Sequence, residues 1–193
     1  LTFACGIENP RVSTKEFLSG QFSIDASIIK SGERFSIIAS SSRLLAIDID
    51  QAISPAKLIE LLASFDLVII DTPTGVSRIT TYFMASADLI VLTSTTEILS
   101  LRGALNSKDY AESAGHSGQL QLLITKATQL LDDEFKSLIG EDFALLEPTI
   151  RSSLQVSAAQ SQAMSVLTLD AKSEVAADYR EVTYSLLEKL ELI

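Results

Sequence analysis

Apolar residues occur along the chain in short runs that end in polar residues, and segments with helical spacing separate these runs. The most marked run is Leu67-Val68-Ile69-Ile70, which ends at Asp71 and is followed at once by the turn of residues 72–75. A run without polar alternation is typical of a strand buried on both faces of a parallel sheet. The pattern therefore predicts a central strand at residues 67–70, with Asp71 at the sheet edge where α/β folds bind ligands.

The other elements follow from the same periodicity. Strands are predicted at residues 35–39, 88–93, 120–125 and 143–146, and helices at 13–18, 23–30, 54–64, 78–86, 98–113, 132–139, 151–163 and 173–189. Ser13 and Glu16 have capping-box spacing, and Ser54-Pro55 places a cap before a proline at the first helical position. Strands and helices alternate through connections too long for hairpins, which indicates βαβ units. The sequence thus predicts an α/β fold of three layers, a doubly wound, mostly parallel sheet with helices on both faces, in a single domain over residues 1–193.

Composition narrows the class of protein. No apolar run approaches the roughly 18 residues that a membrane helix needs, and no signal-peptide pattern is visible at the start. Cys5 is the single cysteine, which excludes an internal disulfide and a cysteine-based zinc site and favours a cytoplasmic protein. The formal net charge of −10 opposes general attraction to nucleic acid or anionic lipid. No specific nucleic-acid binding is therefore expected.

Five segments carry a family resemblance in a consistent order. They are Gly6-Ile7-Glu8-Asn9-Pro10, Asp71-Thr72-Pro73-Thr74-Gly75, Glu97-Ile98-Leu99-Ser100-Leu101-Arg102, Leu122-Leu123-Ile124-Thr125-Lys126 and Leu145-Leu146-Glu147-Pro148. From Leu1 to about Leu190 the chain resembles the MinD/ParA-type deviant Walker P-loop ATPases, including the flagellar-number ATPases. The second segment resembles Walker B and the switch that follows it. Each match is weak alone, but five in the right order make a specific signal.

The resemblance implies roles for particular residues. Asp71 would be the catalytic Walker B acid and hold a magnesium-bound water, which suits a hard cation. The other nucleotide-binding residues would be Thr72, Pro73 and Gly75 on the phosphate side and Thr125, Lys126 and Pro148 beside the adenine. Glu97, Ser100 and Arg102 would border a dimer interface. The implied cofactors are ATP or ADP and Mg²⁺, and the implied partners are a second subunit and a protein of a positioning or secretion system.

Plainer interpretations stand beside these roles. Asp71 could simply cap the following helix, and Lys126 could be a solvated lysine at a strand end. Glu97 and Arg102 could belong to a solvated helix start. Ile150 stands where the family often carries an acid, which puts the adenine contacts of that loop in doubt.

The phosphate loop of the family is missing from residues 1–193. The eight glycines are scattered, and none lies in a Gly-x-x-x-x-Gly-Lys-Ser/Thr frame, whose backbone N–H groups and lysine would cradle phosphates. We therefore expect that these residues alone do not hydrolyse ATP, and that an N-terminal portion with the first βαβ unit lies upstream. The alternatives are a separate chain that supplies this portion, or a sheet that has re-paired without it.

Two further functions compete with a nucleotide-dependent dimeric switch for spatial positioning. The first alternative is a non-catalytic ParA-like scaffold that has lost phosphate binding. The second is a doubly wound regulatory domain resembling a response regulator, which predicts clustered acids after the first strand; residues 35–39 show none. Direct membrane binding is not expected, because the last residues, 187–193, are acidic rather than basic and amphipathic.

Overall fold

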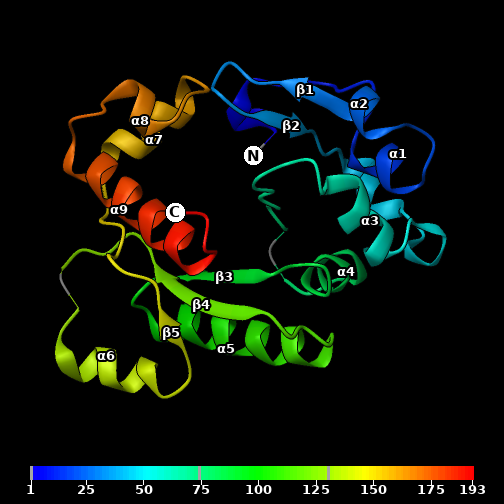
Figure 1. Ribbon diagram of the computed structural model, residues 1–193. Coiled ribbons are helices and arrows are strands. Elements are labelled where there is room, and N and C mark those ends of the chain that lie inside the picture. Colours follow the sequence, from blue (N-terminus) through cyan, green and yellow to red (C-terminus); the bar gives the residue numbers. More distant parts are fainter. Residues whose placement is uncertain (1, 74, 130) are drawn as a thin grey trace. The chain divides into compact units, whose positions relative to one another are not determined.

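The computed structural model describes residues 2–73, 75–129 and 131–193 (Figure 1). The chain forms two compact units. Unit 1 comprises Leu1–Ser86 and Gln160–Met164, and unit 2 comprises Ala87–Ala159 and Ser165–Ile193. Each unit has its own elements and its own buried residues.

Unit 1 is built mainly of short helices. Its α-helices are α1 (Thr14–Leu18), α2 (Ile24–Ser27), α3 (Pro55–Leu62) and α4 (Arg78–Met84), its 3₁₀ helices are Phe3–Cys5, Ser42–Ala46 and Ile49–Gln51, and its strands are β1 (Ile28–Lys30) and β2 (Ser36–Ile38). The predicted caps are confirmed. The Glu16 carboxylate accepts a hydrogen bond from the Ser13 backbone N–H at 2.9 Å, and the Ser54 hydroxyl accepts one from the Lys57 N–H at 3.2 Å.

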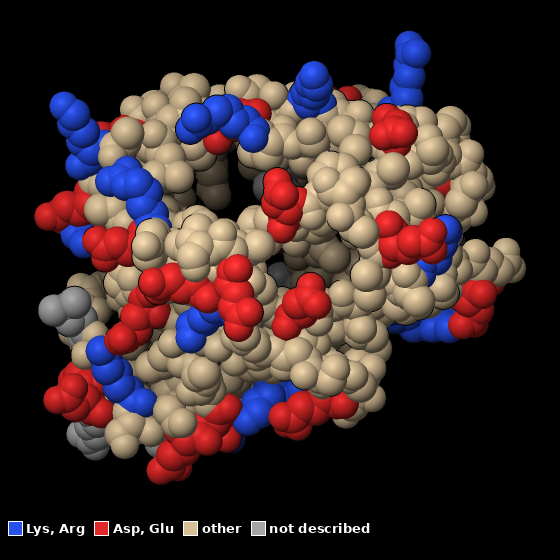
Figure 2. Space-filling model, viewed as in Figure 1, with Lys and Arg blue, Asp and Glu red and all other residues tan. Residues whose placement is uncertain are grey.

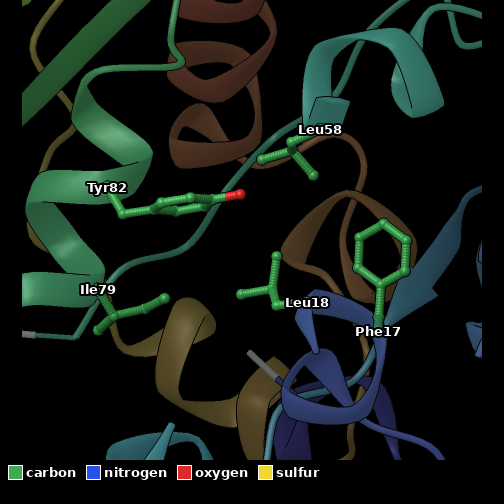
Figure 3. Close-up of a cluster of buried hydrophobic side chains, with 5 residues drawn as sticks. All are labelled: Phe17, Leu18, Leu58, Ile79 and Tyr82. Atoms are coloured by element: carbon green, nitrogen blue, oxygen red, sulfur yellow. The ribbon is translucent and has the colours of Figure 1, made fainter. Parts of the chain in front are cut away.

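The core of unit 1 joins three helices (Figure 3). It consists of Phe17 and Leu18 from α1, Leu58 from α3, and Ile79 and Tyr82 from α4. The Tyr82 hydroxyl donates to the Ile53 carbonyl at 2.7 Å, so the ring is buried without leaving its polar end unsatisfied. Burial raises the pKa of this phenol. These contacts hold α4 in place at the end of the segment that contains Asp71.

The first predicted strand and the helix before it need correction. The helix expected at residues 23–30 ends at Ser27, and the next three residues form β1. Ile28 and Ile29 pair antiparallel with Ile38 and Ile37 of β2, because β-branched side chains pack well on a pleated surface. The strand predicted at residues 35–39 is therefore present, but it belongs to a small antiparallel ladder rather than to the parallel sheet.

The central strand predicted at residues 67–70 is not formed in this structure. No strand is assigned there, and Leu67, Val68 and Ile69 are 44%, 41% and 79% exposed. A strand exists only where a neighbouring strand takes up its backbone hydrogen bonds. Within the described ranges no strand pairs with this stretch, so the expectation of burial on both faces is wrong.

Unit 2 contains the parallel sheet. Its strands are β3 (Leu89–Ser94), β4 (Gln119–Ile124) and β5 (Ala144–Leu145), and its helices are α5 (Ile98–Ser113), α6 (Asp133–Gly140), α7 (Leu154–Ser161, whose last residues belong to unit 1), α8 (Val166–Leu169) and α9 (Glu174–Lys189). The strand order is β3-β4-β5, with both pairs parallel. Helices flank the strands, and Figure 1 shows α5 and α9 on opposite sides of them. The predicted α/β fold with a parallel sheet is thus confirmed, and Leu122 and Ile124 of β4 are fully buried in its core.

One helix in unit 2 starts later than its sequence suggests. The helix expected from residue 151 begins at Leu154, because the backbone of Arg151 forms an isolated parallel bridge with Ala127. The Ser152 N–H also donates to the Ala127 carbonyl at 2.8 Å. Residues 151–152 thus prolong the sheet contact beyond β5. The short helix α8 was not predicted.

Candidate functional site

Hydrogen bonds link the residues at and just after the carboxyl ends of the three parallel strands. The Thr125 N–H, just after β4, donates to the Ser94 carbonyl of β3 at 2.7 Å. On the other side, the Ala127 N–H donates to the Ile150 carbonyl at 3.0 Å. This edge of a parallel sheet is where α/β folds bind ligands. The structure therefore places Thr125 and Lys126 next to the loop that follows Pro148.

Lys126 has an unusual backbone conformation. Its φ is +53°, in the left-handed region that side chains other than glycine and asparagine seldom occupy. The residues on both sides of it are hydrogen-bonded to β3 and to the loop after β5, so the turn must be completed within one residue. Strain of this kind persists where surrounding contacts over-determine it, and it is concentrated at functional sites. The side chain itself is exposed.

Pro148 lines a groove beside this edge. The groove has a volume of about 610 Å³ and is lined by Leu131, Lys136, Glu147, Pro148, Thr149, Glu181, Tyr184 and Ser185. The Lys136 ammonium lies 2.6 Å from the Glu147 carboxylate, a contact that raises the pKa of Lys136. The Ser185 hydroxyl donates to the Glu147 carbonyl at 2.9 Å and so ties the loop to α9. Thr125 and Lys126 are not among the lining residues.

Arg151 is a residue of this edge that the sequence did not single out. Its guanidinium donates to both carboxylate oxygens of Asp178 on α9, at 2.7 and 2.8 Å, and it also pairs with Glu174. The hydrogen bond from Arg151 lowers the pKa of Asp178, and the pKa of Arg151 is raised in turn. The only sequence signal was the pair of acids at i and i+4 near the start of a helix, which are neighbours on its surface.

The start of α5 holds the residues expected at a dimer interface. Ser100 is hydrogen-bonded within its own chain: its hydroxyl accepts from the Thr95 N–H at 3.0 Å and from the Ser94 hydroxyl at 2.8 Å. Glu97 and Arg102 are exposed. The intervening Ile98 and Leu99 are 75% and 80% exposed, which leaves an apolar surface in the first turn of the helix.

Asp71 and its neighbours belong to unit 1. Asp71, Thr72, Pro73 and Gly75 are exposed, and Gly75 has a φ of +85°, as the predicted turn requires. The cap of α4 is Ser77, whose hydroxyl accepts from the Thr80 N–H at 3.2 Å. The alternative that Asp71 caps this helix is therefore wrong. One residue of the motif matches, Thr74, lies outside the described residues.

The described residues do not form a dedicated metal cage. No group of three or more His, Cys, Asp or Glu side chains that could hold a metal ion is found among them. A single carboxylate such as Asp71 suits a magnesium ion that keeps most of its water ligands, since Mg²⁺ sheds water reluctantly. The side chain therefore fits a magnesium ion held through water, but not one that is fully enclosed by protein.

The surface carries no broad basic area on the face shown in Figure 2. On this face, the Lys and Arg side chains of the described residues do not merge into one continuous patch, and Asp and Glu lie between them. None of the helices in the described ranges has the length and apolar character that a bilayer crossing requires.

Solved structures share this fold. No protein-family model and no curated protein matches the sequence. The cell division ATPase MinD of Pyrococcus furiosus aligns with a TM-score of 0.77 at 18% identity, over 98% of this chain and 81% of that chain. The septum site-determining protein MinD of Pyrococcus horikoshii, complexed with Mg-ADP, aligns with a TM-score of 0.74 at 16% identity, over 94% and 76%. The MinC:MinD cell division protein complex of Aquifex aeolicus gives 0.74 at 17% identity, over 97% and 78%. The chain thus has a MinD-type fold, as its motifs suggested.

Proposed function

We propose that the chain is the body of an ATP-binding switch of the MinD/ParA type, which dimerises with nucleotide and helps to position division, flagellar or secretion machinery in the cytoplasm. The observation that carries the proposal is the MinD-type fold, which extends over almost the whole chain. In this proposal both units belong to one ATPase domain.

The base side of the nucleotide is assigned to unit 2. Thr125 and Lys126 would lie along the base and Pro148 on its other side, with the aliphatic part of Lys126 covering an apolar ring face. Support comes from the left-handed backbone of Lys126 at the carboxyl edge of the sheet and from the groove at Pro148. The adenine-nucleotide complex of one structural neighbour agrees with this choice of ligand.

The phosphate side is assigned to Asp71, Thr72, Pro73 and Gly75. Asp71 would hold magnesium through a water molecule, and the ion would supply charge neutralisation for the phosphates. Thr72 and the turn after it would respond to the γ-phosphate. Residues 1–193 contain no phosphate-loop frame, so they supply only part of the contacts that a nucleotide needs.

Nucleotide binding is the decisive measurement. Isothermal titration of the full gene product that contains residues 1–193 with ATP and Mg²⁺ should show binding, and Asp71→Asn should remove the magnesium dependence of that binding. Asp66→Asn, a change of another exposed acid in the same segment, is the matched control and should leave binding intact. Absence of binding in the wild-type protein would contradict the proposal.

Dimerisation is expected to involve Glu97, Ser100 and Arg102 at the start of α5. Exposed apolar residues between them, Ile98 and Leu99, are suited to burial against a second subunit. Light scattering should show a dimer with Mg-ATP in the wild-type protein and a monomer in Leu99→Asp. A dimer of Leu99→Asp as stable as the wild type would place the interface elsewhere. The MinC:MinD complex among the structural neighbours supports a further protein partner.

A non-catalytic scaffold is the second candidate function. The observation that favours it is the absence of a Gly-x-x-x-x-Gly-Lys-Ser/Thr frame in residues 1–193. A scaffold should dimerise without nucleotide and show no ATP binding in the same titration. The two measurements above therefore separate the switch from the scaffold.

A further inference from the structure

Arg151 lies where the exit of β5 meets the exit of β4. Three consecutive residues of this loop are tied to Ala127, the residue directly after Lys126. The Ile150 carbonyl accepts from the Ala127 N–H at 3.0 Å, Arg151 forms the parallel bridge, and the Ser152 N–H donates to the Ala127 carbonyl at 2.8 Å. Any movement of Arg151 would thus be passed to the turn that carries Lys126.

Asp178 fixes Arg151 through both its backbone and its side chain. Asp178 is only 6% exposed, and its carboxylate accepts from the Arg151 N–H at 3.1 Å, from Nε at 2.7 Å and from Nη2 at 2.8 Å. Two parallel donors on one carboxylate give the pair a defined geometry, which a lysine ammonium cannot reproduce. Glu174, one turn earlier on α9, pairs with Nη1 and completes the clamp.

The clamp is not explained by stability alone. The Arg151 side chain is 45% exposed and that of Glu174 is 82% exposed, so only the Asp178 end of the clamp is removed from water, and exposed ion pairs add little to folding. What the pair does provide is a fixed direction for the loop of residues 148–151. This loop and the strained residue Lys126 are the two segments proposed to lie on either side of the nucleotide base.

We propose that Arg151 is a positioning residue for the base side of the nucleotide site, and that its clamp on Asp178 holds the Pro148 loop and the Lys126 turn in register. The inference rests on the proposed function. It assigns no contact between Arg151 and the nucleotide. Its signature is a loss of affinity for the base that leaves affinity for the phosphates unchanged.

The test compares ATP with inorganic tripolyphosphate, which has no base. Both are titrated with Mg²⁺ into the full gene product and into its Arg151→Lys variant. The variant keeps the positive charge but loses the two parallel N–H donors of the guanidinium. We expect the Kd for ATP to rise about 3- to 10-fold, the cost of ordering one or two loosened groups on binding, while the Kd for tripolyphosphate stays the same.

Two control variants separate positioning from general destabilisation. Arg180→Lys changes an arginine of α9 outside the clamp, which donates to the Ala171 carbonyl, and should bind ATP like the wild type. Val182→Ala truncates a buried residue of the same helix and should lower the melting temperature without changing either Kd. If Arg151→Lys has an unchanged Kd for ATP, or loses both ligands equally, Arg151 has no positioning role. If the wild-type protein binds neither ligand, the proposed function fails and the inference fails with it.

Discussion

The backbone of Lys126 shows how much a single residue can be constrained by its neighbours. Its φ of +53° is imposed by hydrogen bonds on both sides, from Thr125 to Ser94 and from Ala127 to Ile150. A lysine gains nothing from this conformation by itself, whereas asparagine tolerates it. Its side-chain chemistry was predictable from the sequence, but its strained backbone was not.

Lys126→Asn should stabilise the protein. Relief of left-handed strain should raise the free energy of unfolding by about 0.5 to 1 kcal/mol, measured by urea denaturation. Lys172→Asn is the matched control, because Lys172 is exposed and has no positive φ; it should change the value by less than about 0.5 kcal/mol. Equal effects of the two substitutions would show that the conformation of Lys126 carries no strain.

Asp178 should make stability depend on pH in a defined direction. Its folded-state pKa lies below the unfolded value of about 3.9 because Arg151 donates to it. Its contribution is therefore fully present above the unfolded pKa and is lost as pH falls through the folded pKa. Asp178→Asn should cost about 2 kcal/mol at neutral pH, and the difference from wild type should shrink below about pH 4. Urea denaturation across this range measures it, and a difference that grows on acidification would contradict the assignment.

At the scale of elements, β4 combines an apolar core with one unsatisfied polar group. Gln121 is 5% exposed, and its side-chain oxygen has no hydrogen-bond partner among the described residues. Gln119, two residues earlier on the same strand, is exposed and donates its amide to the Lys189 carbonyl at 3.0 Å. The two glutamines therefore differ in burial and in the hydrogen bonds of their side-chain amides, although the side chains are identical.

Gln121→Leu should raise the free energy of unfolding by about 1 kcal/mol, since a buried amide whose oxygen lacks a hydrogen-bond partner among the described residues is replaced by an apolar group of similar size. Gln119→Leu removes a satisfied, exposed amide and should give no gain. Chemical denaturation of both variants against the wild type provides the comparison. A loss of stability in Gln121→Leu would mean that a hydrogen bond to water satisfies the buried oxygen.

The stretch at residues 67–70 is where sequence pattern and structure disagree. Its residues have the pattern of a buried strand, yet Ile69 is 79% exposed. In the chain of 193 residues, Ile69→Lys should change the free energy of unfolding by less than about 0.5 kcal/mol. Leu122→Lys, in the fully buried centre of β4, should cost about 3 kcal/mol or more. A comparable loss in both variants would show that the stretch is buried as its sequence suggests.

At the scale of the whole molecule, the amino-acid composition sets the net charge, and the net charge affects binding to nucleic acid. The net charge of −10 repels a polyanion at a distance, and on the face in Figure 2 the Lys and Arg side chains of the described residues are scattered, with Asp and Glu between them. The protein should therefore show no binding to duplex DNA at about 0.15 M salt in a fluorescence anisotropy titration. Saturable binding under these conditions would reveal a local basic site outside that face.

The sequence by itself determined the features that depend on neighbouring residues. The helices at residues 98–113 and 173–189, the caps at Ser13 and Ser54, and the strands of the parallel sheet were all predictable, because periodicity and capping act within a few residues. The ends of two strands were also recognisable as candidate ligand positions, at Thr125-Lys126 and at Pro148. These signals identified the α/β class and the order of the motifs.

Tertiary structure alone decided the pairings between distant segments. The clamp of Arg151 on Asp178 joins residues 27 positions apart, the left-handed turn at Lys126 depends on hydrogen bonds that its neighbours donate to β3 and to the loop after β5, and the exposure of residues 67–69 depends on whether any strand lies beside them. None of these is encoded in local spacing, because hydrogen-bond partners and burial are set by which remote segments meet. The chain therefore specified its elements and its candidate chemistry, and the fold decided which of those residues act together.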